Sequence, residues 1–200
     1  MLLSASRGSL GGIVLAITVI LYRYNLGHIG KFIRYAAKGV VVAVIFFPLW
    51  GGLSQYVLDK NESNLTQGGI MYSRETKMAA RLYEIQHNFI SGVGFSVIDE
   101  TVDSVDRTTG TIEPNSSWLG VFSMTGIFGF IIFLSIFIHA FISAYRKIPD
   151  IENAVLLCGI LAFFMVHMMI EGYVLAGGNF LCGTYWLTLG VVYANVYEKF

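Results

Sequence analysis

Two polar side chains near the carboxy-terminal end of this chain have the spacing of partners in proton transfer. His167 and Glu171 stand four residues apart at the end of an apolar run. Residues at this spacing share one face of a helix, so an imidazole and a carboxylate could form a proton relay there. The other interpretation is a structural pair at the end of a membrane helix, capped by the nearby Tyr173.

Arginines at two places in the chain form a second group of candidates. Arg7 stands at the start of the first apolar segment, whereas Arg74 and Arg81 lie in the long polar stretch that follows the second. A guanidinium near hydrocarbon is costly unless it is paired or reaches back to water, so Arg7 is either functional or an anchor at the end of a span. Arg74 is either functional or a solvated residue paired with Glu75.

The composition indicates that lipid is the solvent of most of the chain. Of its 200 residues, 55% are hydrophobic and 13% are charged, and the mean hydropathy is +0.65. A soluble domain of this size cannot bury so much apolar surface, and helices are the expected membrane-spanning form because their backbone groups are satisfied internally. The net charge of zero gives no indication of a nucleic acid partner.

The apolar runs predict an all-α integral membrane protein, a polytopic bundle of about five transmembrane helices. The first run is short for a bilayer of ~30 Å and reaches full length only if residues 1–9 are included. Because the chain enters the membrane at its first residue, we expect it to be the carboxy-terminal part of a longer polytopic protein. The predicted spans are Leu10–Tyr22, Gly39–Val57, Trp118–Ser143, Ala154–Ile170 and Phe180–Val196.

Basic residues set the predicted orientation. They crowd the short segments after the first, third and fifth runs, which lie on one side if the spans alternate, and this side is predicted to be cytoplasmic. Residues 1–57 then hold two spans with a short cytoplasmic loop, 58–117 form a large external loop, and 118–200 hold three spans. The basic residues in question are Arg23, Lys31, Arg34, Lys38, Arg146, Lys147 and Lys199.

Within the external loop, the spacing of apolar residues predicts an amphipathic surface helix. We expect this helix to lie over the external ends of the spans or on the membrane surface, with its apolar stripe turned inward. Gly92-Val93-Gly94 then ends it and permits a close approach of its backbone to another segment. The stripe consists of Met78, Leu82, Ile85 and Phe89.

Three segments, in this order, resemble motifs of the O-antigen ligase and polysaccharide polymerase superfamily. They are Leu3-Ser4-Ala5-Ser6-Arg7-Gly8, then Ser73-Arg74 followed by Gly92-Val93-Gly94-Phe95, and finally 114–129, which begins Pro-Asn-Ser-Ser-Trp. The resemblance implies a multi-pass glycosyltransferase of the bacterial inner membrane, active in lipopolysaccharide or exopolysaccharide biosynthesis. It would use polyprenyl-diphosphate-linked glycans at the external face, without a cofactor or metal.

The resemblance also implies roles for particular residues. Arg7 and Arg74 would bind the diphosphate, because a guanidinium meets phosphate oxygens with two parallel hydrogen bonds. Arg81 is a further candidate for this role. Trp118, in the third motif, would stack on a sugar ring, although such aromatic residues more often pack or lie at the membrane interface.

One departure from the family pattern concerns the base. Asn115 stands in the catalytic position where ligases carry a histidine, and an amide cannot act as a general base. Glu113 could substitute for it, as could His167 with Glu171. The departure favours a polymerase over a ligase.

Other functional classes stay open. A non-catalytic membrane scaffold or a truncated remnant is the main alternative, whereas a transporter would need charged groups near mid-membrane, and the spans have almost none. The implied partners are the lipid-linked glycan, the bilayer, and either missing amino-terminal spans or a chain-length regulator. Cys158 and Cys182 have no metal-site spacing and are interpreted as packing residues.

Overall fold

The computed structural model of the chain describes residues 7–25, 30–31, 33–35, 37–39, 72–95, 105–106, 111–112, 116–148 and 150–197. For residues 7–8, 72–77, 105–106, 111–112 and 151 only the backbone is described. The regular secondary structure of the described part is helical apart from one short antiparallel pair of strands. Its elements are α1 (Arg7–Tyr24), α4 (Tyr72–His87), β1 (Val105–Asp106), β2 (Thr111–Ile112), α5 (Ser117–Arg146), α6 (Ile151–His167) and α7 (Phe180–Tyr197).

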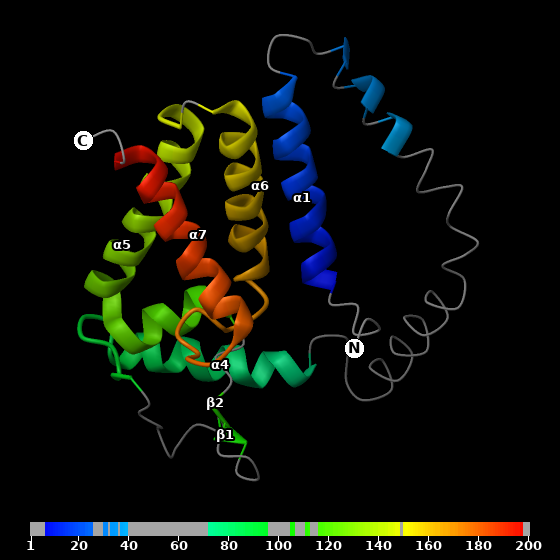
Figure 1. Cartoon of the computed structure of the whole chain (residues 1–200). Helices are drawn as coiled ribbons and strands as arrows, with labels where there is room; N and C mark the ends of the chain where they lie inside the picture. The colour runs from blue at the N-terminus through cyan, green and yellow to red at the C-terminus, as the bar shows by residue number, and fades with distance from the viewer. Residues whose placement is uncertain are drawn as a thin grey trace.

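α1, α5, α6 and α7 stand side by side, and α4 lies crosswise at one end of them (Figure 1). α1 packs along α6, and α5, α6 and α7 enclose the core. α1, α5 and α7 begin at the end where α4 lies, and α6 ends there (Figure 1). We call this the α4 end. The predicted all-α bundle is therefore confirmed for the described residues.

One described helix, α5, is long and apolar enough to cross a membrane. The segments Ser9–Tyr24 and Glu152–His167 are apolar but shorter. Most of the predicted second span, 39–57, lies outside the described residues. The number of membrane crossings therefore stays a prediction.

The core of the bundle is an aromatic cluster between α5, α6 and α7. The Tyr185 ring meets the Phe164 ring edge-on at 5.4 Å and stacks on Phe137 at 6.5 Å. α1 joins α6 through a close contact, because a side chain at Gly12 would collide with the ring of Phe163. This packing fixes the position of the start of α1 relative to the end of α6.

The prediction that the apolar stripe of α4 faces the bundle is wrong. Leu82 is 48% exposed and Phe89 is 50% exposed, whereas Arg81 and Glu84 are each 1% exposed. Of the apolar stripe, only Ile85 is buried, at 8%. The reason is that α4 packs on α5 through a polar pair that finds a hydroxyl partner there, and this contact leaves Leu82 and Phe89 of the stripe exposed.

The prediction that Gly92-Val93-Gly94 approaches another backbone closely is confirmed, and the partner is α5. This helix is interrupted at Gly126, which has φ 67° and ψ −171°. The segment Phe89–Gly94 supplies hydrogen-bond partners to the interrupted turn, so backbone groups that the helix cannot pair are satisfied. Val93 N donates to Ser123 O (2.8 Å), Gly94 N to Met124 O (3.0 Å) and Ile127 N to Phe89 O (2.9 Å).

Three of the basic residues that the sequence assigned to one side lie at the opposite end of the bundle from α4. Arg23 is in the last turn of α1, and Arg146 and Lys147 close α5. The Arg23 guanidinium lies 4.2 Å from the centroid of the Tyr145 ring, so it joins the ends of these two helices. These three residues therefore share one end of the bundle, and the orientation in a membrane stays a prediction.

Candidate functional site

The α4 end gathers polar side chains from segments that are far apart in the sequence. They come from the start of α1, from α4, from the start of α5, and from the turn between α6 and α7 (Figure 1). Three of these segments either carry a motif of the resemblance or directly follow one. The α4 end is therefore the candidate site.

His167 is the last residue of α6 and links it to the start of α1. Its Nε2 atom forms a hydrogen bond of 3.0 Å with the Ser9 hydroxyl. The ring stacks on Phe163 at 4.9 Å, and the side chain is 5% exposed. Because Ser9 stands two residues after Arg7, this bond fixes the segment that carries Arg7.

Glu171 lies one turn beyond His167 in the connection between α6 and α7. Its amide donates to His167 O at 3.0 Å, so the helical spacing continues past the end of α6. The carboxylate interacts electrostatically with both His167 and Tyr173. The predicted neighbourhood of His167 and Glu171 is thus present.

Tyr173 completes this group from the same connection. It is 2% exposed, its ring lies 5.4 Å from that of His167, and burial raises the pKa of its phenol. The phenol therefore stays protonated at neutral pH. Its hydroxyl and Nδ1 of His167 are both buried without a hydrogen-bond partner in the described part of the chain.

Ser116 and Ser117 attach the start of α5 to this connection. Ser116 is the N-cap of α5, and its hydroxyl donates to Met168 O at 3.2 Å. The Ser117 hydroxyl donates to Glu171 O at 2.8 Å. The third motif and the α6–α7 connection, more than 50 residues apart, therefore form one structural unit.

Trp118 lies in the aromatic core next to these serines. Its indole N–H donates to Met165 O at 3.2 Å, and its ring meets those of Phe133 and Phe137 edge-on, each at 5.5 Å. The ring is half-buried. These contacts give Trp118 a packing role, and its predicted stacking on a sugar stays a prediction.

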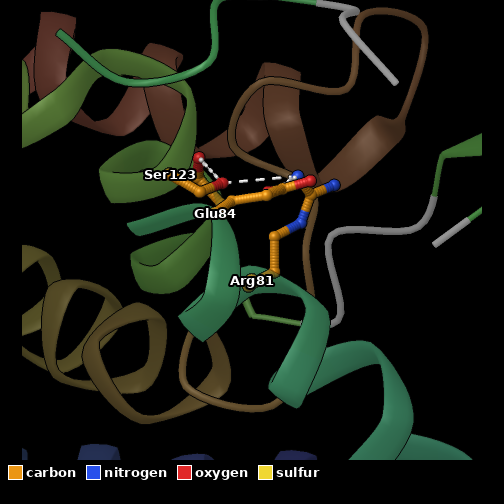
Figure 2. Close-up of polar contacts among 4 residues, drawn as sticks. Arg81, Glu84 and Ser123 are labelled. Atoms are coloured by element: carbon orange, nitrogen blue, oxygen red, sulfur yellow. Dashed lines mark hydrogen bonds and ion pairs between the residues drawn. The ribbon is translucent and has the colours of Figure 1, made fainter. Parts of the chain in front are cut away.

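Arg81 and Glu84 form a buried ion pair on the inward face of α4. Figure 2 shows both side chains beside Ser123 of α5. Arg81 Nη1 lies 2.6 Å from Glu84 Oε2 and donates to the Ser123 hydroxyl at 3.3 Å. Arg81 Nη2 and Glu84 Oε1 have no partner among the described residues. Glu84 already balances the charge of Arg81, so a diphosphate at Arg81 would have to compete with it.

The structure places the other predicted residues less completely. The backbones of Arg7 and Arg74 are described, in the first turns of α1 and α4, but their side chains are not. Glu113 and Asn115 lie outside the described residues. Asn115 directly precedes Ser116, the N-cap of α5.

Sequence reasoning missed four residues of this region: Ser9, Ser117, Glu84 and Ser123. The three-residue spacing of Arg81 and Glu84 was a usable signal for their pairing. The serines carried no signal, because their partners are distant in the sequence. Among the described residues there is no group of three or more metal-ligating side chains.

Comparisons of the chain with protein-family models, with curated proteins and with solved structures give no match.

Proposed function

We propose that this chain acts as a multi-pass membrane glycosyltransferase, a polysaccharide polymerase rather than a ligase. It would act on polyprenyl-diphosphate-linked glycans at the external face of the bacterial inner membrane. One observation supports this most directly. The start of α1 with Arg7, the first turn of α4 with Arg74, and the start of α5 within the third motif all belong to the α4 end.

The proposed chemistry is a single displacement. An acceptor hydroxyl oxygen forms a bond to the anomeric carbon of the donor sugar, and the bond from that carbon to the diphosphate oxygen breaks. The diphosphate leaves with the electron pair, and Arg7 and Arg74 stabilise its charge. Glu171 takes the proton of the acceptor hydroxyl.

The contacts of His167 and Arg81 suggest other roles for them within this proposal. His167 is buried and already bound to Ser9, so it orients the start of α1 and thereby Arg7. Arg81 is paired with Glu84 and holds α4 on α5. Glu171, half-buried near His167, is the better candidate for the base.

The test compares polymer formation in cells that depend on this protein for the product. Replacing Arg7 or Arg74 by lysine keeps the charge and removes the planar fork, and loss of one such contact typically lowers the rate by ~10²–10³. Arg146→Lys is the matched control, because Arg146 lies exposed at the opposite end of the bundle and should leave the product unchanged.

Unchanged product from both Arg7→Lys and Arg74→Lys, at normal protein levels, would contradict the diphosphate site. Glu171→Gln tests the base separately, since the amide keeps the size of the side chain and cannot accept the proton. If all three variants remain active, the non-catalytic scaffold becomes the better interpretation.

A further inference from the structure

The connection between α6 and α7 depends on one serine of α5 for much of its hydrogen bonding. Ser117 is 3% exposed, and both its amide and its hydroxyl bind main-chain groups of that connection. The amide donates to Met168 O (2.9 Å) and Glu171 O (3.1 Å), and the hydroxyl donates to Glu171 O (2.8 Å) while accepting from Tyr173 N (3.1 Å) and Val174 N (3.4 Å).

These bonds matter because the connection has no regular structure of its own. α6 ends at His167 and α7 begins at Phe180. The amides of residues 168–171 still bond to main-chain carbonyls of α6, whereas the amides of Tyr173 and Val174 bond to the Ser117 hydroxyl. Buried main-chain groups without partners are costly, and here the neighbouring helix supplies the partners. Ser117 is therefore a local determinant of the conformation between Met168 and Val174.

The consequence reaches the candidate base directly. The Glu171 carbonyl is held by both the amide and the hydroxyl of Ser117, so the residue that carries the carboxylate has little freedom to move. Tyr173, held through its amide, is fixed with its ring against His167.

We propose that Ser117 is a positioning residue, which sets the α6–α7 connection and thereby the place of the Glu171 carboxylate at the α4 end. The part of this inference that concerns Glu171 as a base rests on the proposed function. The part that concerns the conformation of the connection does not. A positioning residue of this kind acts on turnover, because a small misplacement of a reacting group can lower a rate by ~10²-fold.

The first measurement is hydrogen–deuterium exchange of the whole protein in lipid nanodiscs. Ser117→Ala removes the acceptor of the Tyr173 and Val174 amides, so the peptide containing them should exchange about tenfold faster or more. Ser135→Ala is the matched control, since Ser135 is in the same helix and its hydroxyl binds only the carbonyl of Ile131 in that helix. Unchanged exchange in Ser117→Ala would overturn the inference.

The second measurement is transfer of the lipid-linked glycan by the same preparations. Ser117→Ala should lower kcat by ~10-fold to 10²-fold with little change in the KM of the donor, because the diphosphate contacts are untouched. If Ser117→Ala does not accumulate, Ser117→Cys keeps the size with a weaker hydrogen-bonding group and should give both effects at smaller amplitude.

The two measurements separate the possible failures. Faster exchange with unchanged kcat, in a protein that Glu171→Gln inactivates, would overturn the positioning role and leave the proposed function intact. Faster exchange with full activity in both Ser117→Ala and Glu171→Gln would reject Glu171 as the base, and the positioning role with it. Faster exchange with lowered kcat in both variants supports the inference.

Discussion

The buried pair of Arg81 and Glu84 offers a sharp test of how α4 is held. Both side chains are 1% exposed, and their nearest charged atoms are 2.6 Å apart. At an effective dielectric constant of ~20, two unit charges at this distance attract by about 6 kcal/mol. The desolvation of two buried ions offsets a gain of this size, so the net contribution of the intact pair should be small.

Single replacements should behave very differently from the double replacement. Arg81→Met or Glu84→Met leaves the other charge buried and uncompensated, which typically costs about 3–5 kcal/mol. Arg81→Met combined with Glu84→Met removes both charges and keeps comparable volume. We expect it to cost far less than either single replacement, because Arg81 Nη2 and Glu84 Oε1 are already without partners in the described part.

The assay is equilibrium unfolding of the purified protein in mixed micelles, with the free energy of unfolding measured for the three variants. Arg146→Met is the control, because this exposed arginine lies away from α4 and should change stability by less than about 0.5 kcal/mol. If the effects of the single replacements add in the double variant, the two side chains are not coupled and the buried pair is not what holds α4.

Three further predictions concern the backbone contacts and the orientation. Gly126→Ala should destabilise the protein by about 2 kcal/mol or more in the same unfolding assay, because φ is positive there and the methyl group would meet the backbone of Ile90. The control is Gly190→Ala, which lies in open space on α7 and should be neutral or slightly stabilising. Gly12→Ala should lower stability more than Gly11→Ala, since only the first places a methyl group against the Phe163 ring at less than normal contact distance. A cysteine at Thr109 should react with an impermeant thiol reagent in spheroplasts, because the loop 58–117 is predicted to be external; labelling only after lysis would reverse the orientation.

The sequence was sufficient to predict the positions of the helices that are apolar over their whole length. The predicted spans Trp118–Ser143, Ala154–Ile170 and Phe180–Val196 match α5, α6 and α7 to within a few residues at each end. Hydropathy serves well here because burial in lipid or in the core selects the same residue types. It does not report the break at Gly126, where a local backbone conformation interrupts an otherwise continuous apolar run.

The face of α4 could not be predicted from apolar spacing alone. The stripe containing Leu82 and Phe89 was a valid amphipathic signal, yet the helix turns Arg81 and Glu84 inward. An ion pair that neutralises itself can be buried more easily than separate charges, and Ser123 offers a further hydrogen bond. The position of α5 decides which face of α4 turns inward, and this position cannot be derived from the sequence of α4 alone.

The polar contacts at the α4 end could not be predicted from the sequence for a related reason. Ser9 and His167 are 158 residues apart, and Ser117 and Glu171 are 54 apart. Spacing rules apply within one helix or strand, so they identified His167 and Glu171 as neighbours and gave no information on what each would meet. Such contacts follow from the packing of whole helices, which side-chain periodicity does not specify.

The break in α5 connects the two parts of the candidate site mechanically. The first part of α5 carries Ser117, which forms hydrogen bonds with the α6–α7 connection. This part ends at Gly126, where the segment after α4 supplies the hydrogen bonds that the helix lacks. Moving α4 away would leave those backbone groups unpaired and would separate Arg81 from Ser123, at a cost of several bonds at once. The helix that begins near Arg74 and the connection that carries Glu171 are therefore both fixed to the same nine-residue piece of α5, Ser117–Thr125. Catalytic stabilisation of charge requires groups that are fixed before the reaction begins, and a shared rigid attachment of this kind is how residues from distant segments can meet that requirement.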